Sequence, residues 1–476
     1  MLSPTARDRM SRWLAAVRRD DGMALATVMA ISAVLFLLAT TLVMLSTQQT
    51  LSAADQVQRT KALHAADAGI NAYSYMLSRN PAAAKTQPTV PGKPADASWT
   101  VTAVPPGAGS AVTQLTSTGR IAADDGGPAV TRIIKATVNP GSFADYMFLY
   151  NTDLTLAADG LIRGRVWCNG SITNNGEITD YAYASGSVGG SGIYDKTPTP
   201  NAGTKVFSTV DFATLKSIAT TDGTYYSMGS AYQFATQGAV GANSNRYTHA
   251  YLGYNVVLSG NGGTITKITS ISTTSGAMGL DASTATNFTT PPNGVLYFDD
   301  PIWVGGTYSA KLTIVEGDDI EDGTNNDPGM SGMNPTSTAS PEPNNVNSSV
   351  FIWKNLVSSD PSNADQVCGI VTKGDISLTS EYPTTVTPDR MTVQAAMLST
   401  VGSIHADLKS GVTKAYLKIL GARAQWETGG VQSGSPVSSG YIDRDYWYDT
   451  NLDITTPPNF PPLGDGTLKV QQWVEN

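Results

Sequence analysis

Residues 24–45, ALATVMAISAVLFLLATTLVML, decide how the 476 residues of this chain are organised. The stretch is continuously apolar, and the wider segment 22–54 contains no charged residue. A helix of this length extends about 33 Å, which is enough to cross the hydrocarbon core of a bilayer. The sequence therefore predicts one membrane-spanning helix near the N-terminus.

Arginine is concentrated on the N-terminal side of this stretch. The arginines there are Arg7, Arg9, Arg12, Arg18 and Arg19. Because positive residues that flank a span tend to stay in the cytoplasm, we expect a single-pass protein with a cytoplasmic N-terminus. Everything after residue 45 is then expected on the outer side of the cytoplasmic membrane.

The predicted helix continues beyond the membrane. Apolar residues recur there at alternating steps of three and four, which is the spacing of one helical face. These residues are Leu63, Ala66, Ile70, Tyr73 and Leu77. Since no Gly or Pro lies in residues 23–68, we expect one helix over residues 23–79, apolar in its first half and amphipathic in its second.

A small antiparallel sheet is predicted over residues 80–142. The Pro- and Ala-rich segment 80–97 is typical of a loop that leaves a helix. Three strand-like runs follow at 99–104, 112–121 and 129–138, separated by the turn sequences PPGAG and ADDGG. Packed on the second half of the helix, these strands would form an α+β head.

Beyond residue 143 short strands alternate with Gly- and Asn-rich turns. The apolar residues expected to point inward in the first of these units are Leu156, Ile162, Val166, Ile172 and Ile178. Repeated strands with no helix between them favour a coiled parallel sheet, a β-helix or β-solenoid, over residues 143–476. A β-sandwich is the alternative, although it would show cleaner alternation and tighter hairpins.

Two segments of this predicted β domain stand out by composition. The spacing of Phe212, Leu215 and Ile218 predicts a helical insertion near residues 208–220. The aromatic and Pro-rich segment 440–462 is expected to cap an open end of the sheet, because an exposed sheet edge invites pairing with other chains.

Composition limits the classes of function. Charged residues make up 14% of the chain and Gly and Pro number 46 and 26, which is typical of a β-rich extracellular protein. The net charge is −9, and no cluster of Lys or Arg occurs outside the first twenty residues. The chain therefore offers no electrostatic attraction for a phosphate backbone, and we expect no nucleic-acid partner.

The residue types that usually carry chemistry are sparse. Cys168 and Cys368 are too few for a disulfide framework or a cysteine-rich zinc site, which leaves open either two buried thiols or one disulfide. The histidines His64, His249 and His405 lack metal-ligand spacing. Because nucleotide-binding and hydrolase motifs are also absent from the sequence, we expect no catalytic residue and no organic cofactor.

An acidic run at residues 316–327 is the candidate for a metal site. Asp318, Asp319 and Asp322 could supply oxygen ligands to calcium, although the run departs from the EF-hand pattern. A solvated turn at the end of a strand is the alternative interpretation, and it is the favoured one.

The N-terminal part of the chain, about residues 18–80, resembles a known family. Residues 18–23, RRDDGM, followed at once by the apolar stretch, resemble a type III leader, which prepilin peptidase cuts after glycine. The predicted helix contains an alanine-rich motif made of Ala65, Ala66, Asp67, Ala68 and Gly69. Together, the leader, the helix and this motif make residues 18–80 similar to the PilX family of minor pilins of type IV pilus systems.

The resemblance implies a leader at residues 1–22, cleavage between Gly22 and Met23, and an extracellular location in a filament after export. It also implies major and minor pilins, prepilin peptidase and the inner-membrane assembly machinery as partners. One position departs from major pilins: Thr27 stands at the fifth mature residue, where they carry glutamate. An amine buried in the filament core would lack that carboxylate, so we expect a place at or near the tip, in assembly or initiation.

Two alternative functions remain at this stage. The β domain could belong to a membrane-anchored adhesin that contacts a surface glycan, a host cell or another cell surface. It could also act on polysaccharides, in which case Asp299, Asp300, Asp318 and an exposed Trp303 are the candidate residues. Both alternatives place a β-helix outside the cell but require no pilus.

Overall fold

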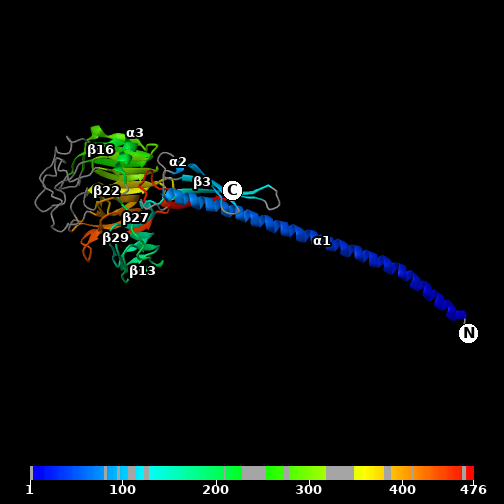
Figure 1. Ribbon diagram of the computed structural model, residues 1–476. Coiled ribbons are helices and arrows are strands. Elements are labelled where there is room, and N and C mark those ends of the chain that lie inside the picture. The colour runs from blue at the N-terminus through cyan, green and yellow to red at the C-terminus, as the bar shows by residue number, and fades with distance from the viewer. Residues whose placement is uncertain are drawn as a thin grey trace.

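The computed structural model describes residues 4–79, 83–93, 97–105, 113–122, 128–207, 210–227, 253–271, 278–317, 348–379, 388–406, 408, 411–463 and 468–475. Within these ranges the chain has a long N-terminal helix, a small antiparallel sheet and a larger, mostly β domain (Figure 1). The helix, α1 (Pro4–Arg79), is about 114 Å long at 1.5 Å per residue. The predicted order of a long helix followed by a mostly β region is confirmed.

The head is a five-stranded sheet. Its strands are β1 (Thr89–Gly92), β2 (Ser98–Val104), β3 (Thr113–Ile121), β4 (Val130–Pro140) and β30 (Leu468–Glu475). They pair antiparallel in the order β1-β2-β3-β4-β30. β2, β3 and β4 correspond to the three predicted strands. β30 is not anticipated by the sequence analysis, which assigns its residues to the β domain.

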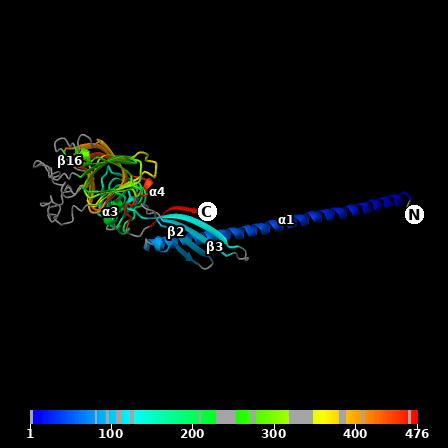
Figure 2. The same ribbon diagram turned by 90° about the horizontal axis from the view of Figure 1, so that it is seen from above.

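The second half of α1 packs along one face of the head sheet (Figure 2). Ala66, Ile70, Tyr73 and Leu77 are buried there and Leu63 is half-buried, which confirms the predicted stripe. A short helix, α2 (Ala83–Thr86), follows α1, and the Tyr73 hydroxyl donates to the carbonyl of Gln87 at 2.7 Å. The hydroxyl of a buried tyrosine thus fixes the chain where it turns into the sheet.

The β domain consists of many short strands with few helices. Its elements are η1 (Phe143–Asp145), β5 (Phe148–Tyr150), β6 (Leu154–Leu156), β7 (Leu161–Arg163), β8 (Val166–Cys168), β9 (Ile172–Asn174), β10 (Glu177–Ile178), β11 (Ala182–Ala184), β12 (Val188–Gly189), β13 (Ile193–Tyr194), α3 (Phe212–Thr221), β14 (Tyr225–Tyr226), β15 (Tyr254–Gly260), β16 (Gly262–Ile271), β17 (Met278–Leu280), η2 (Ala282–Thr284), β18 (Thr286–Thr289), β19 (Val295–Phe298), β20 (Ile302–Tyr308), β21 (Leu312–Glu316), β22 (Ser348–Ser358), β23 (Cys368–Thr372), β24 (Asp375–Leu378), β25 (Arg390–Ser399), β26 (Ile404–Ala406), β27 (Thr413–Gln425), β28 (Gln432–Ser433), β29 (Ser439–Tyr448) and α4 (Asn451–Ile454). The helix expected near residues 208–220 corresponds to α3.

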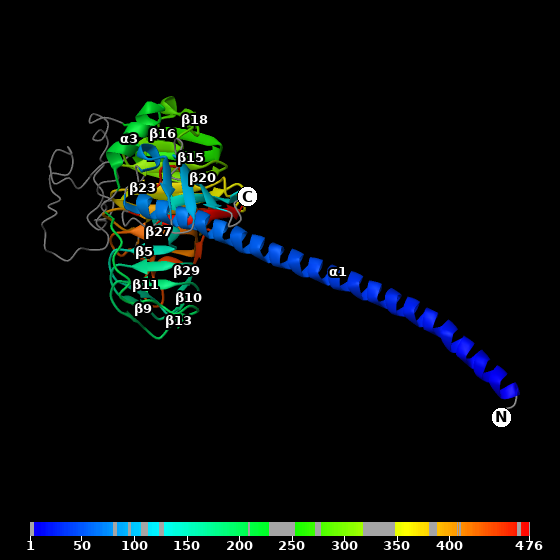
Figure 3. The ribbon, with the colours of Figure 1, turned by 45° about the vertical axis from the view of Figure 1, so that its right-hand side comes forward.

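Most of these strands pair in parallel, and their order in space differs from their order in the chain. One ladder runs β19-β21-β23-β25-β27-β5-β8-β11. A second runs β22-β25-β27-β29-β7-β10-β13, and a third joins β6, β9 and β12. Since β5 and β7 lie beside β27 and β29, the chain enters the β domain in the middle of the stack (Figure 3).

The chain also leaves the β domain from the middle of the stack. After β13 it returns along the first strands, where the Asn169 side-chain amide donates to the carbonyl of Lys205 at 2.7 Å. It then continues through α3 and β14 to the opposite end, and comes back strand by strand to β29. Entry and exit meet where the amide of Leu463 donates to the carbonyl of Gly141 at 2.6 Å. The whole β domain is therefore an insertion between β4 and β30 of the head.

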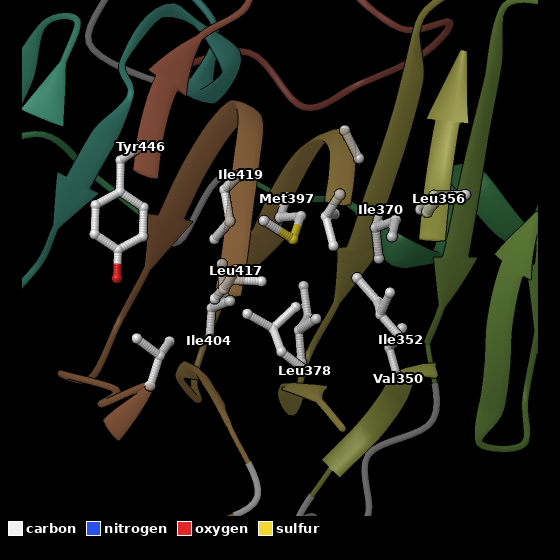
Figure 4. Close-up of a cluster of buried hydrophobic side chains, with 14 of the residues drawn as sticks. Val350, Ile352, Leu356, Ile370, Leu378, Met397, Ile404, Leu417, Ile419 and Tyr446 are labelled. Atoms are coloured by element: carbon white, nitrogen blue, oxygen red, sulfur yellow. The ribbon is translucent and has the colours of Figure 1, made fainter. Parts of the chain in front are cut away.

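Aliphatic side chains fill the interior of the β domain. Figure 4 shows part of this core, in which neighbouring strands place one apolar side chain above the next. The residues labelled there are Val350, Ile352, Leu356, Ile370, Leu378, Met397, Ile404, Leu417, Ile419 and Tyr446. The five residues predicted to point inward in the first units are all buried, with exposed fractions of at most 5%. Parallel strands covered on both faces explain why the sequence shows apolar runs rather than clean alternation.

The segment 440–462 does not cap an end of the stack. Its first part belongs to β29, which pairs with β27 on one side and β7 on the other. The Pro-rich remainder follows the side of the domain, where Phe460 approaches Gly369 and the carbonyl of Pro458 accepts from the Thr313 hydroxyl. The prediction of an end cap is wrong, because the chain folds back to the middle of the stack.

Candidate functional site: the long helix and its junctions

Residues 27–45 of α1 form a largely apolar surface with nothing packed on it in the described chain. One segment of the helix, Thr27–Ser78, contains a stretch long and apolar enough to span a membrane, and that stretch is wholly exposed. Side chains such as Leu35, Phe36 and Leu42 are more than half exposed. An exposed apolar rod of this length requires lipid or other helices around it, which is compatible with a single-pass anchor.

The motif of residues 65–69 forms the contact between α1 and β3. Ala65, Ala66 and Gly69 are buried, whereas Asp67 and Ala68 lie toward the outer side of the helix. A Cβ atom added at Gly69 would lie 2.4 Å from the Ser117 hydroxyl oxygen, so only a hydrogen side chain fits this place without a shift of neighbours.

Gly119 of β3 is the counterpart of this motif on the sheet. A Cβ atom added there would lie 2.1 Å from the carbonyl oxygen of Ala62 and 2.4 Å from the amide nitrogen of Ala66. The backbone of the helix therefore rests directly on the backbone of the strand. Small residues on both elements permit this close approach, and the motif fixes where the head lies along α1.

A cluster of charged residues lies where the chain passes between the head and the β domain. We call Asp145, Lys469, Asp453 and Arg165 the junction cluster. Asp145 of η1 accepts a hydrogen bond from Lys469 Nζ of β30 at 2.7 Å, and its other oxygen accepts from the amide of Ser142 at 2.9 Å. The cluster thus joins the last strand of the head to the first turn of the β domain.

The other half of the junction cluster involves α4. Asp453 lies 3.3 Å from Lys469 Nζ and also accepts a hydrogen bond from the guanidinium of Arg165. Burial raises the pKa of Asp145 above its usual value, and the nearby charges of Lys469 and Arg165 only partly offset this effect. No local pattern in the sequence reveals this cluster, because the pairs Asp145–Lys469 and Arg165–Asp453 join positions 324 and 288 residues apart.

The residues of the predicted leader junction lie within α1. The helix passes through Gly22 and Met23 without a break in its backbone. Thr27 follows one turn later and is exposed. The geometry brings the processing residues and Thr27 onto one continuous helix.

The two cysteines are not brought together. Cys168 lies in β8 and Cys368 in β23, and both are buried free thiols. Four ladder steps separate these strands, from β23 through β25, β27 and β5 to β8. At about 4.8 Å per step this is roughly 19 Å, far beyond the reach of a disulfide. The interpretation as two buried thiols is therefore favoured, and the disulfide is wrong for this fold.

Only some of the candidate residues for metal binding or polysaccharide chemistry lie in the described part of the chain. Asp318, Asp319 and Asp322 lie outside the described residues, and within the described ranges no group of three metal-ligating side chains occurs. Asp299 accepts from Lys216 Nζ at 2.8 Å and from the hydroxyl of Tyr225.

Trp303 is not an exposed ring. It is 2% exposed and stacks on Phe351 with ring centroids 4.2 Å apart. Asp300 is also buried, at 2% exposure. The expectation of an exposed tryptophan is wrong, because β20 places Trp303 against Phe351 of the neighbouring strand β22.

Comparison with known proteins gives no match to this chain. No protein-family model matches it, and neither a curated protein nor a solved structure does so.

Proposed function

We propose that the chain is a minor pilin-like subunit of a type IV pilus or a related filament. Prepilin peptidase would cut between Gly22 and Met23, and the exposed apolar stretch of α1 at residues 27–45 would pass from lipid into the bundle of helices at the filament core. The observation that carries the proposal is the continuity of α1, which has this apolar stretch in its middle and carries the head near its C-terminal end.

The β domain would be the part that the filament presents to a surface or a partner. We interpret its parallel ladders as the faces of a β-solenoid, because strands separated by one short unit of chain pair in register, as Phe148 does with Val166 and Val166 with Ala182. The sheets of a β-sandwich are antiparallel, so the parallel pairing does not favour that alternative.

The position of Thr27 supports a place at or near the tip. A buried amine without a carboxylate partner is costly in an apolar core, and a terminal subunit avoids part of this cost. We predict that Thr27→Glu increases the amount of this protein recovered in sheared filaments, whereas Thr27→Gln, which has the same shape without the charge, does not. Quantitative mass spectrometry of the filament fraction measures both; equal recovery of the two variants would remove the electrostatic argument.

Immunogold labelling of intact filaments tests the function itself. An epitope inserted at Gly203, an exposed residue outside the helices and strands with open space around it, should label one end of each filament. Labelling along the shaft at the density of the major subunit would contradict the tip assignment. Labelling of cell envelopes with none on filaments would contradict the pilin assignment and favour a separate anchored adhesin.

A further inference from the structure

The edge strand β30 of the head leaves apolar side chains uncovered in the described chain. Val470 and Trp473 are 49% and 46% exposed, although they belong to a strand of a packed sheet. We call these two residues the β30 flank. Figures 1 and 2 both show β30 running from the β domain in the direction of the N-terminal end of α1, and its pairing with β4 places it at the edge of the head sheet.

Register places the β30 flank on the face of the sheet that carries α1. Val470 pairs with Val138 and Trp473 with Ala136, and both of these β4 residues are buried in the core beneath the helix. Directly opposed residues in a sheet point to the same face. The flank therefore lies on the same face of the sheet as α1, but outside the strands that α1 covers. Val474 pairs with exposed Lys135 and points to the opposite face.

The other edge of the same face is closed. Val90 of β1 and Trp99 of β2 pack against the head core, and the alanines of α2 are buried beside them. Pro91 in β1 also lacks an amide proton, which makes this edge a poor template for another strand. The head is therefore asymmetric, with one covered side and one side that still presents apolar surface.

The distances between packed helices and between paired strands indicate what fits over the β30 edge of the head sheet. The helix α1 lies over β3 and β4. Packed helices run about 8–10 Å apart, which equals roughly two strand spacings of 4.8 Å. A second helix parallel to α1 would therefore lie over β30 and its outer edge. Subunits anchored in one membrane hold their helices parallel, so such a neighbour meets the flank in this orientation.

The outer face of α1 itself shows what such a helix can present. His64, Ala68, Ala72 and Tyr75 form its exposed stripe at helical spacing. Two of the four are alanines, which allow close approach to an aromatic side chain. A subunit of the same architecture thus carries a surface that suits the flank.

We propose that Val470 and Trp473 are a docking surface for the head-proximal helix of a neighbouring subunit anchored in the same membrane. This inference rests on the proposed function and adds to it the contact through which the subunit joins the next one. Pairing of a strand with the free edge of β30 is a different contact, and the two can be separated because Val474 lies on the same strand but faces away from α1.

Photocrosslinking in cells tests the contact at the level of residues. Benzoylphenylalanine replaces Trp473 in one full-length variant and Val474 in a matched control, and crosslinked peptides are mapped by mass spectrometry. We expect the probe at 473 to mark a helical segment just after the apolar span of an anchored subunit, with several-fold less of this product from 474. Equal products from both positions, products with strand segments, or products with lipid alone would overturn the proposal.

Substitution gives a second measurement. Trp473→Glu should lower recovery of the protein in filaments, whereas Val474→Glu should leave it near the wild-type level. The N-terminus of each variant is determined in parallel. A chain that begins at Met23 and enters filaments, but shows no preference for position 473, would contradict the docking surface while leaving the pilin function intact.

Discussion

The head with its helix and the β domain differ in how far their apolar side chains are buried. The β domain encloses its aliphatic residues between parallel strands, whereas α1 and β30 leave apolar side chains such as Leu42 and Trp473 in solvent. Burial of apolar area is the main favourable term in folding. Where a folded protein leaves apolar area exposed, the favourable free energy of burying it is gained only when lipid or another protein covers that surface. Under the proposed function, the head and its helix would make the assembly contacts, and the β domain, which has its own core, would be carried by them.

The largest test of this comparison removes the β domain altogether. Residues 143–461 are replaced by Asn-Gly, since Ser142 and Pro462 form a β-bridge and a two-residue turn can join adjacent antiparallel strands. We expect the shortened chain to insert in the membrane and keep a protease-resistant head, as β4 and β30 become a hairpin. Complete degradation of the shortened chain by mild proteolysis, with the full chain resistant, would show that the head depends on the β domain.

The contact between helix and sheet provides the next largest effect. Gly119→Val should destabilise the head by about 3 kcal/mol, because the new side chain meets the backbone of α1 at Ala62 and Ala66. Gly189→Ala in the β domain is the control, since a Cβ atom there meets nothing within 4 Å, and its effect should stay below about 0.5 kcal/mol. Thermal unfolding of both variants in detergent measures the difference; equal shifts would contradict the backbone contact.

The junction cluster should have a smaller effect of about 2 kcal/mol. Lys469→Met leaves the carboxylate of Asp145 buried without its main partner, so it should destabilise the protein more than the double change with Asp145→Asn. Denaturant unfolding of the two variants and the wild type provides the comparison. If the double variant is the least stable of the three, the cost does not arise from an unpaired carboxylate.

The same carboxyl group predicts a pH dependence. Because the pKa of Asp145 is raised in the fold above its usual value of 3.8, the native state binds the proton more tightly than the unfolded chain. Its contribution to stability is therefore present below 3.8 and is lost as the pH rises through the raised pKa. As the pH rises from 3.8 through the raised pKa, the free energy of unfolding of the wild type should fall relative to that of Asp145→Asn. A rise over the same pH range would contradict the raised pKa of Asp145.

The smallest expected effect concerns the cysteines. Burial raises the pKa of the Cys168 thiol to about 11 and raises that of Cys368 further, so both should resist thiol reagents in the folded protein. A thiol titration should count two free groups after unfolding and none before. A chain that migrates differently on gels with and without reductant would contradict the separation of β8 from β23.

The sequence predicts the parts of this protein that depend on local pattern. The stripe from Leu63 to Leu77, the three strands of the head and the inward positions from Leu156 to Ile178 all follow from spacing along the chain. The return of β30 to the head, the entry into the middle of the stack and the junction of Asp145 with Lys469 do not, because each joins segments that are distant in sequence. Trp303 shows the same limit, since its burial depends on Phe351 in another strand.

Mass spectrometry of the N-terminus of the protein in isolated filaments tests the central claim most directly. The account predicts a mature chain that begins with N-methylated Met23, found in the same fraction as the major filament subunit. An intact chain beginning at Met1, in a strain with active prepilin peptidase and with no copy in the filament fraction, would contradict it.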